Sequence, residues 1–140
     1  NPPLLQTEGF VAALQVSLEA IENRAGLETE LHTDGVGRLS RTLEPALYRI
    51  AMEALNNLVR YARAQKVSVH LSLRSGWVIL DICDNGVGFD LEQARTHGGM
   101  GLHSMEQRAR QLGGRLEVTS IPGSGTHIRA EIPAQERWMQ

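Results

Sequence analysis

Four polar side chains lie at helical spacing between residues 43 and 62, where the apolar residues also predict a helix. They are Glu53, Asn57, Arg60 and Tyr61. At 100° per residue they share one face, opposite the apolar stripe, so a carboxylate, an amide and a cation line one wall of this helix. Such a wall is either part of a binding site or an ordinary solvated face, and the helix alone favours the solvated face.

A further polar group stands where a predicted strand ends. Asp84 opens the segment Asp84-Asn-Gly-Val-Gly-Phe-Asp90, and the period of 2 points its side chain to the same side as Ile82, toward the core. A buried carboxylate needs hydrogen-bond donors, and the exocyclic amine of a purine would supply them. The alternative is a turn aspartate that accepts from its own backbone two residues further on.

A glycine-rich run, Gly98-Gly99-Met100-Gly101-Leu102, precedes a helix predicted to begin near His103. Glycines let a backbone approach a ligand closely, and free N–H groups at a helix start favour an anion, so this pattern suits a phosphate chain. A flexible loop is the alternative. The sequence holds neither a Gly-x4-Gly-Lys-Ser/Thr loop nor a Gly-x-Gly-x-x-Gly fingerprint, which disfavours P-loop and Rossmann binding.

The last predicted strand carries a hydroxyl on its inward side. Thr126 shares that side with Ile128 and Ile132. The hydroxyl could join Asp84 at the same ligand edge, directly or through water, or Thr126 could be only a β-branched strand residue. The sequence supports both interpretations equally.

The elements that must position these groups are predicted from periodicity and turn residues. Helices and antiparallel hairpins follow one another without regular strand-helix-strand alternation. This order predicts an α+β fold, a two-layer α/β sandwich with a mixed, mostly antiparallel sheet and helices on one face. The predicted elements are a helix over residues 10–24, a strand over 27–33, a helix over 43–62, a hairpin over 66–84, a helix over 103–112 and a hairpin over 115–132.

The composition limits the class of protein. With 140 residues, 41% of them hydrophobic, the chain fits one compact domain, and no apolar run approaches the roughly 18 to 20 residues of a membrane span. Its single cysteine, Cys83, cannot form an internal disulfide, which is typical of cytoplasmic proteins. Because the formal net charge is -2, no nucleic acid is expected as a partner.

Taken together, four segments resemble the N, G1 and G2 boxes and the closing strand of the GHKL superfamily of ATP-binding proteins. Two longer stretches, residues 46–57 and 101–109, look like the catalytic domain of NarL-type sensor histidine kinases of bacterial two-component systems. The match spans roughly residues 10–133. In order, the four segments are Glu53-Ala-Leu-Asn-Asn57, Asp84-Asn-Gly86-Val-Gly88-Phe-Asp90, Gly99-Met-Gly101-Leu and Gly123-Ser-Gly-Thr126.

The resemblance implies a Bergerat fold, binding of ATP with Mg²⁺, and phosphoryl transfer to a histidine. By this resemblance Asn57 would be the Mg²⁺ ligand, Glu53 a polar or basic group near the γ-phosphate, and Arg60 a phosphate contact. Tyr61 stands where many members have histidine and belongs to the same expected site.

At the other end of the nucleotide, the resemblance implies that Asp84 takes the adenine amino group and that Thr126 backs the adenine site. Residues 89–98 would form a short ATP lid. The other residues expected at the nucleotide are Gly86 and Gly88, which shape the turn after Asp84, then Gly99, Met100 and Gly101 beside the phosphates, and Leu102 against the base.

The resemblance also implies partners and domain limits. The phosphoacceptor histidine would lie on a separate helical dimerisation element of the same kinase, and a response regulator would act downstream. Residues 1–9 are therefore expected to be a cut end or linker from that element, residues 10–133 the catalytic domain and residues 134–140 a tail. The isolated domain is expected to be monomeric and cytoplasmic, within a homodimeric parent whose membrane anchoring is left open.

Two other functions fit the same residues. A related GHKL ATPase of the topoisomerase, chaperone or mismatch-repair type would use Glu53 to activate water, although such proteins usually have longer lids and further domains. A nucleotide-binding module would sense ATP or bind a regulator without turnover.

Overall fold

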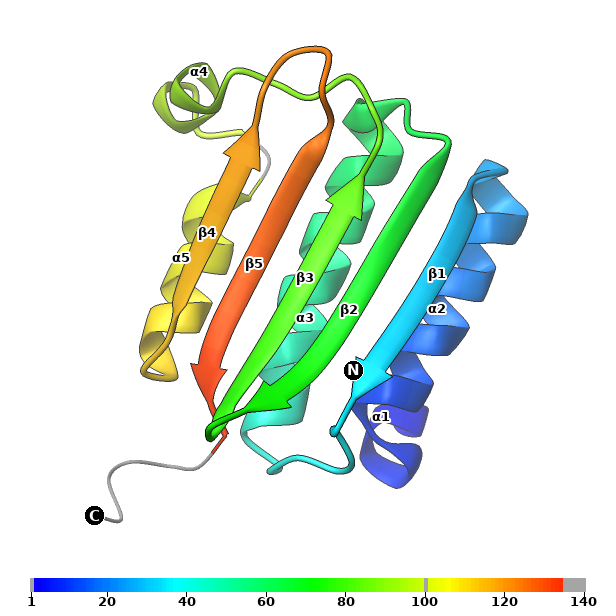
Figure 1. The fold of residues 1–140 in the computed structure, drawn as a ribbon, viewed down its shortest axis with the longest axis vertical. Helices are drawn as coiled ribbons and strands as arrows, with labels where there is room; N and C mark the ends of the chain where they lie inside the picture. Colours follow the sequence, from blue (N-terminus) through cyan, green and yellow to red (C-terminus); the bar gives the residue numbers. More distant parts are fainter. Residues whose placement is uncertain (1, 100, 135–140) are drawn as a thin grey trace.

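The computed structural model describes residues 2–99 and 101–134. A five-stranded sheet carries helices on one face, so the chain forms two layers (Figure 1) and the predicted α+β sandwich is confirmed. In chain order the elements are α1 (Pro3–Glu8), α2 (Phe10–Ala25), β1 (Glu28–Asp34), α3 (Leu43–Asn57), η1 (Leu58–Ala62), β2 (Lys66–Arg74), β3 (Trp77–Asp84), α4 (Leu91–Thr96), α5 (Leu102–Gln111), β4 (Arg115–Ser120) and β5 (Thr126–Pro133).

The strand order of the sheet is β1-β2-β3-β5-β4. β1 runs parallel to β2, because α3 and η1 carry the chain back across the sheet between them, and all other neighbours are antiparallel. β5 lies between β3 and β4, in a register that places Asp84 directly opposite Thr126. Two of the polar residues predicted to share a ligand are therefore neighbours at one end of the central strands.

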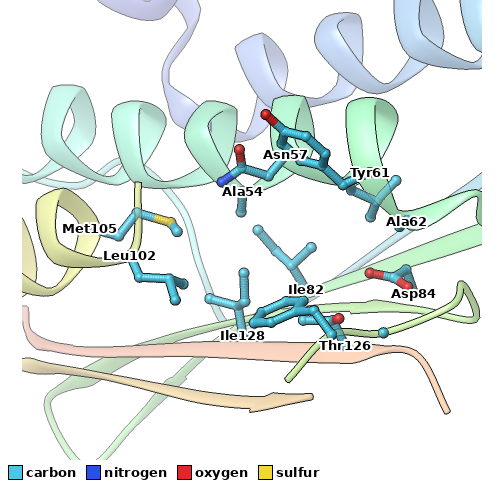
Figure 2. Close-up of a pocket in the computed structure, with 13 residues that line it drawn as sticks. Ala54, Asn57, Tyr61, Ala62, Ile82, Asp84, Leu102, Met105, Thr126 and Ile128 are labelled. Atoms are coloured by element: carbon cyan, nitrogen blue, oxygen red, sulfur yellow. The ribbon is translucent and has the colours of Figure 1, made fainter. Parts of the chain in front are cut away.

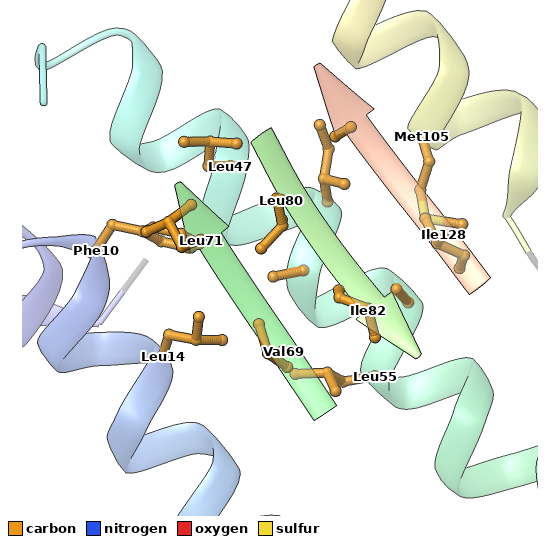
Figure 3. Packing of buried hydrophobic residues seen from close by; sticks show 14 of the residues in the cluster. Phe10, Leu14, Leu47, Leu55, Val69, Leu71, Leu80, Ile82, Met105 and Ile128 are labelled. Carbon is orange, nitrogen blue, oxygen red and sulfur yellow. The ribbon is translucent and has the colours of Figure 1, made fainter. Parts of the chain in front are cut away.

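The core lies between the sheet and the helices. Along each strand alternate side chains point toward the helical layer, as the period of 2 predicts, and they pack against the apolar faces of α2, α3 and α5 (Figure 3). Burying one Leu or Ile side chain stabilises the fold by roughly 1.5 to 3 kcal/mol. Residues at the centre include Leu14, Leu47, Leu55, Val69, Leu71, Leu80, Ile82 and Met105.

A buried carboxylate joins the first three helices. Glu44, in the first turn of α3, is 4% exposed, and its Oε2 accepts the N–H of Phe10 at 3.0 Å. Nη2 of Arg38 lies 3.2 Å from Oε1 of Glu44, and the same guanidinium donates to the carbonyl oxygens of Gln6 and Thr7 at the end of α1. These bonds hold α1 and α2 against the start of α3, the helix whose other end carries the predicted polar wall.

The predicted helix over residues 43–62 is not regular throughout. Its α-helical part ends at Asn57, and residues 58–62 form a π-helical turn before Arg63, which adopts a left-handed φ of 50°. A π-helical turn takes more residues per turn than an α-helix, so side chains beyond Asn57 depart from the predicted phase of 100° per residue.

Two short helices lie in segments where the sequence predicted none. Residues 3–8, expected as part of a linker, form α1, and Leu5 of this helix is 2% exposed in the core. Residues 91–96 form α4 within the expected lid, and its N-cap Asp90 accepts from the N–H of Gln93 at 3.0 Å. Across the described ranges, residues 2–99 and 101–134, the structure contains no helix of the length and apolarity that crossing a membrane requires.

Candidate functional site

A mostly apolar pocket of about 240 Å³ opens between the end of α3 and the central strands. Asp84 lies at one side of it and Leu102 and Met105 at the other, with Asn57 and Tyr61 above (Figure 2). The size and lining suit the apolar ring of a small ligand with a few polar groups at its edges. The lining residues are Ala54, Asn57, Leu58, Tyr61, Ala62, Ile82, Asp84, Gly88, Phe89, Leu102, Met105, Thr126 and Ile128.

Asp84 faces the pocket from the end of β3, as the alternation predicts. Its Oδ1 accepts the N–H of Gly86 at 2.8 Å, so the turn interpretation is confirmed. Burial raises the pKa of Asp84, and the backbone N–H groups of Gly86 and Thr126 oppose that rise. A carboxylate has about four acceptor sites, so it can bind its own turn and still accept from a ligand amine.

The glycines after Asp84 allow close contact between three segments. A Cβ on Gly86 would overlap the carbonyl oxygen of Ala62, which accepts the N–H of Val87 at 2.7 Å. Gly88 has a φ of +66°, and a Cβ there would overlap the carbonyl oxygen of Ile121. The turn is therefore packed closely against η1 on one side and the β4–β5 connection on the other.

Of the four polar residues predicted to form one wall of α3, two line the pocket and two do not. Asn57 is half-buried and lines the pocket, and Tyr61, 48% exposed, lies at its rim. Glu53 does not line the pocket; it lies beside the start of α5, where a Cβ on Gly101 would overlap its carboxylate. Arg60 is exposed, with its guanidinium 5.3 Å from the centroid of the Tyr61 ring, and it is not among the lining residues in the described parts of the chain.

The glycine-rich run leads directly into a helix. α5 begins at Leu102, one residue before the predicted start, and Gly101 is its N-cap in the left-handed conformation with φ +62°. Leu102 is 4% exposed and lines the pocket. Among the described residues, a Cβ on Gly99 would meet nothing within 4 Å apart from its chain neighbours, and Met100 lies outside the described residues. The N–H groups at the start of α5 are thus close to both Glu53 and the pocket.

Thr126 lines the pocket beside Asp84, as one of its two interpretations predicts. The sequence reasoning missed most of the apolar lining. For Ile82 and Ile128 a signal existed, because each lies two residues from a predicted polar residue on the same side of its strand. Ala54, Phe89 and Met105 gave no such signal; they line the pocket only because α3, the lid and α5 come together there.

Known proteins resemble the chain in sequence. Residues 42–136 match the family model described as histidine kinase-, DNA gyrase B-, and HSP90-like ATPase. The sensor histidine kinase LiaS of Bacillus subtilis is 33% identical over 133 residues, which is 95% of this chain and 36% of that protein. The oxygen sensor histidine kinase NreB of Staphylococcus carnosus is 31% identical over 134 residues, or 95% of this chain and 39% of that protein. The chain therefore spans little more than a third of these relatives.

Solved structures share the fold. The blue-light activated histidine kinase of Erythrobacter litoralis EL346 superposes with a TM-score of 0.78 at 24% identity, covering 94% of this chain and 43% of that one. The histidine kinase AdeS of Acinetobacter baumannii gives a TM-score of 0.73 at 23% identity, covering 90% and 65%. Since the family model spans more than half of the chain, and since the pocket, the Asp84 turn and the start of α5 lie within it, the chain belongs to the family of histidine kinase-, DNA gyrase B- and HSP90-like ATPases.

Proposed function

We propose that this chain is the ATP-binding catalytic domain of a sensor histidine kinase and that the pocket beneath α3 holds the adenosine end of ATP. The observation that carries the proposal is a half-buried carboxylate, Asp84, at the edge of an otherwise apolar pocket. Adenine is a flat apolar ring with an amino group at its edge, so it fits both features. The similarity to sensor histidine kinases supports the same choice.

The phosphates would extend from the pocket toward the start of α5. The N–H groups of the first turn of α5, which follows the N-cap Gly101, favour an anion. Mg²⁺ bound to phosphates usually takes only one or two protein oxygens, and the amide of Asn57, half-buried in the wall of the pocket, can provide one. A bound Mg²⁺ would neutralise phosphate charge.

The residues of the chain would then act mainly by positioning the γ-phosphate for an incoming histidine. Glu53, beside Gly101, is the polar or basic group expected at that end of the nucleotide. A phosphate contact from Arg60 would require its exposed guanidinium to move from the Tyr61 ring toward the pocket. The proposed acceptor is a histidine on the dimerisation domain of the same homodimeric kinase, and a response regulator would receive the phosphoryl group afterwards.

A thermal shift experiment tests the nucleotide assignment. ADP and ATP should raise the melting temperature of this chain, whereas GTP should not, because guanine carries a carbonyl where Asp84 needs a donor. A ligand that binds only the folded state at a hundredfold excess over its Kd adds about 2.7 kcal/mol of stability. Equal shifts with ATP and GTP would show that Asp84 does not read an adenine amine.

A further inference from the structure

One hydroxyl outside the pocket contacts two residues that line it. Ser120 ends β4, is half-buried, and lies opposite Thr126 in the register of β4 and β5. Its Oγ accepts the N–H of Phe89 at 2.9 Å and lies 2.8 Å from Oγ1 of Thr126. It also lies 3.3 Å from the carbonyl oxygen of Gly125, to which it can donate. Phe89 and Thr126 line the pocket and Ser120 does not.

Either hydroxyl could donate in the contact between Ser120 and Thr126, and the other two contacts of Ser120 favour one assignment. A serine hydroxyl has one hydrogen and two lone pairs. A carbonyl oxygen can only accept, so the contact with Gly125 uses the hydrogen of Ser120, and the N–H of Phe89 occupies one of its lone pairs. The hydrogen between Ser120 and Thr126 must then come from Thr126. Ser120 can make all three hydrogen bonds at once only if Thr126 is the donor in the bond between the two hydroxyls.

The consequence lies inside the pocket. With its hydrogen directed to Ser120, the Thr126 hydroxyl presents only lone pairs to a ligand. Asp84, its direct neighbour across β3 and β5, is also an acceptor. The polar edge of the pocket therefore offers two acceptors side by side, which suits a 6-amino purine, whose amine has two hydrogens, and repels the carbonyl oxygen of a 6-oxo purine.

We propose that Ser120 is a positioning residue for base specificity: it holds the Thr126 hydroxyl as an acceptor, so that the pocket prefers 6-amino over 6-oxo purine nucleotides. This inference rests on the proposed function, because it requires a purine at Asp84. Without Ser120 the Thr126 hydroxyl is free to turn and donate to a 6-oxo group. Ser120→Ala should therefore weaken selectivity more than affinity.

The test compares the affinities of ADP and inosine 5′-diphosphate. The base of inosine 5′-diphosphate has an oxo group in place of the 6-amino group and therefore also a hydrogen on N1, and the two nucleotides are otherwise identical. Isothermal titration of the wild-type chain should give much tighter binding of ADP. Ser120→Ala should lower the ratio of the two affinities by about tenfold, the worth of one ordinary hydrogen bond. Thr119→Ala is the matched control, because Thr119 is the preceding residue of β4, is exposed, and faces the other side of the sheet.

A double mutant separates this role from a merely structural one. In a Thr126→Val background no hydroxyl remains to be oriented, so adding Ser120→Ala should leave the ratio unchanged. A ratio that falls equally in both backgrounds would mean that Ser120 acts through Phe89, and it would overturn the inference, as would an unchanged ratio in Ser120→Ala alone. If the wild-type chain bound neither nucleotide, or bound both equally, the proposed function itself would fail.

Discussion

At the scale of single residues, Asp84 has two roles, one in the turn that follows β3 and one in the pocket. Its carboxylate closes its own turn through Gly86, and it also provides the polar edge of an apolar pocket. Burial raises its pKa, so the folded domain holds the ionised carboxylate at a cost in stability. A residue kept at such a cost is a strong candidate for binding.

The variant Asp84→Asn should separate the contribution of this carboxylate to ligand binding from its effect on the stability of the fold. We expect ADP binding to weaken by about 2 kcal/mol, roughly thirtyfold, because the amide presents an NH₂ group or a weaker acceptor to the base. Without ligand, the variant should be more stable than wild type at neutral pH. Because the pKa is higher in the fold than in the unfolded chain, ionisation on raising the pH destabilises the wild-type fold.

The measurement is urea unfolding of both proteins, without nucleotide, from pH 7 to acid pH. The stability advantage of Asp84→Asn should shrink as the pH falls, since wild-type Asp84 then becomes protonated and neutral as well. An advantage that grew toward low pH would contradict the direction assigned to this pKa.

Asn57 and Asn56 provide a second comparison at this scale. Asn57 is half-buried and lines the pocket, whereas Asn56 is exposed, about 100° further back around α3. Asn57→Ala should weaken Mg²⁺-dependent ATP binding, measured by titration with and without Mg²⁺, and Asn56→Ala should match wild type. The opposite result would mean that the amide at position 57 does not face the metal-bound phosphates.

At the scale of elements, the site depends on segments that pack with almost no space between them. The turn after β3 contacts η1 through Gly86, and α5 approaches α3 where Gly101 meets Glu53. Each contact is possible because one partner lacks a Cβ. The glycines of the boxes therefore act by letting two elements meet, in addition to any contact with a ligand.

Gly86→Ala tests this role. The added Cβ would overlap the backbone carbonyl of Ala62, which cannot move without displacing η1, so we expect a loss of about 2 kcal/mol in the free energy of unfolding and weaker ADP binding. Gly37→Ala is the matched control for stability, because a Cβ there meets nothing within 4 Å. Urea unfolding compares the two, and equal stabilities would show that the turn is not packed against η1.

At the scale of the whole molecule, the two faces of the sheet have different characters. Helices cover one face (Figure 1). The other face carries polar side chains such as the stacked pair His32 and His70 and the Asp81–Arg129 ion pair. His70 lies between the inward residues Val69 and Leu71, so its ring points away from the layer that contains the pocket. These histidines are badly placed to receive a phosphoryl group from the same domain.

On the function proposed above, in which the acceptor histidine lies on a separate dimerisation domain, we expect the purified chain, incubated with radiolabelled ATP, to incorporate no acid-labile phosphate. It should label a separately supplied dimerisation domain of the proposed parent kinase. This transfer should be slow, because separate domains lack the effective concentration, typically millimolar, that a short flexible linker supplies. Asp84→Asn should abolish this transfer, and His70→Ala should leave it unchanged. Phosphohistidine mapped to any histidine of this chain would contradict the prediction, and ATP hydrolysis without transfer would favour the related ATPases.

The sequence by itself determined the local features of this protein. Alternation predicted the inward side of Asp84 and Thr126, helical spacing predicted the α3 stripe, and glycines predicted the turns, because each of these depends on neighbours within a few residues. The resemblance of four ordered boxes then identified the fold and the family. The short helices α1 and α4 were not predicted, because neither has enough turns to show the helical period of apolar residues.

Only the tertiary structure decided how these features meet. The π-helical turn after Asn57 shifted the side chains that follow it, and Arg60 consequently lies outside the pocket that Asn57 lines. The packing of α5 beside α3 placed Glu53 against Gly101, and the pairing of β4 with β5 brought Ser120 to Thr126. The α3–α5 contact joins residues far apart in the chain, and the β4–β5 pairing depends on a strand register. Their geometry follows from how whole elements pack, which no local pattern encodes.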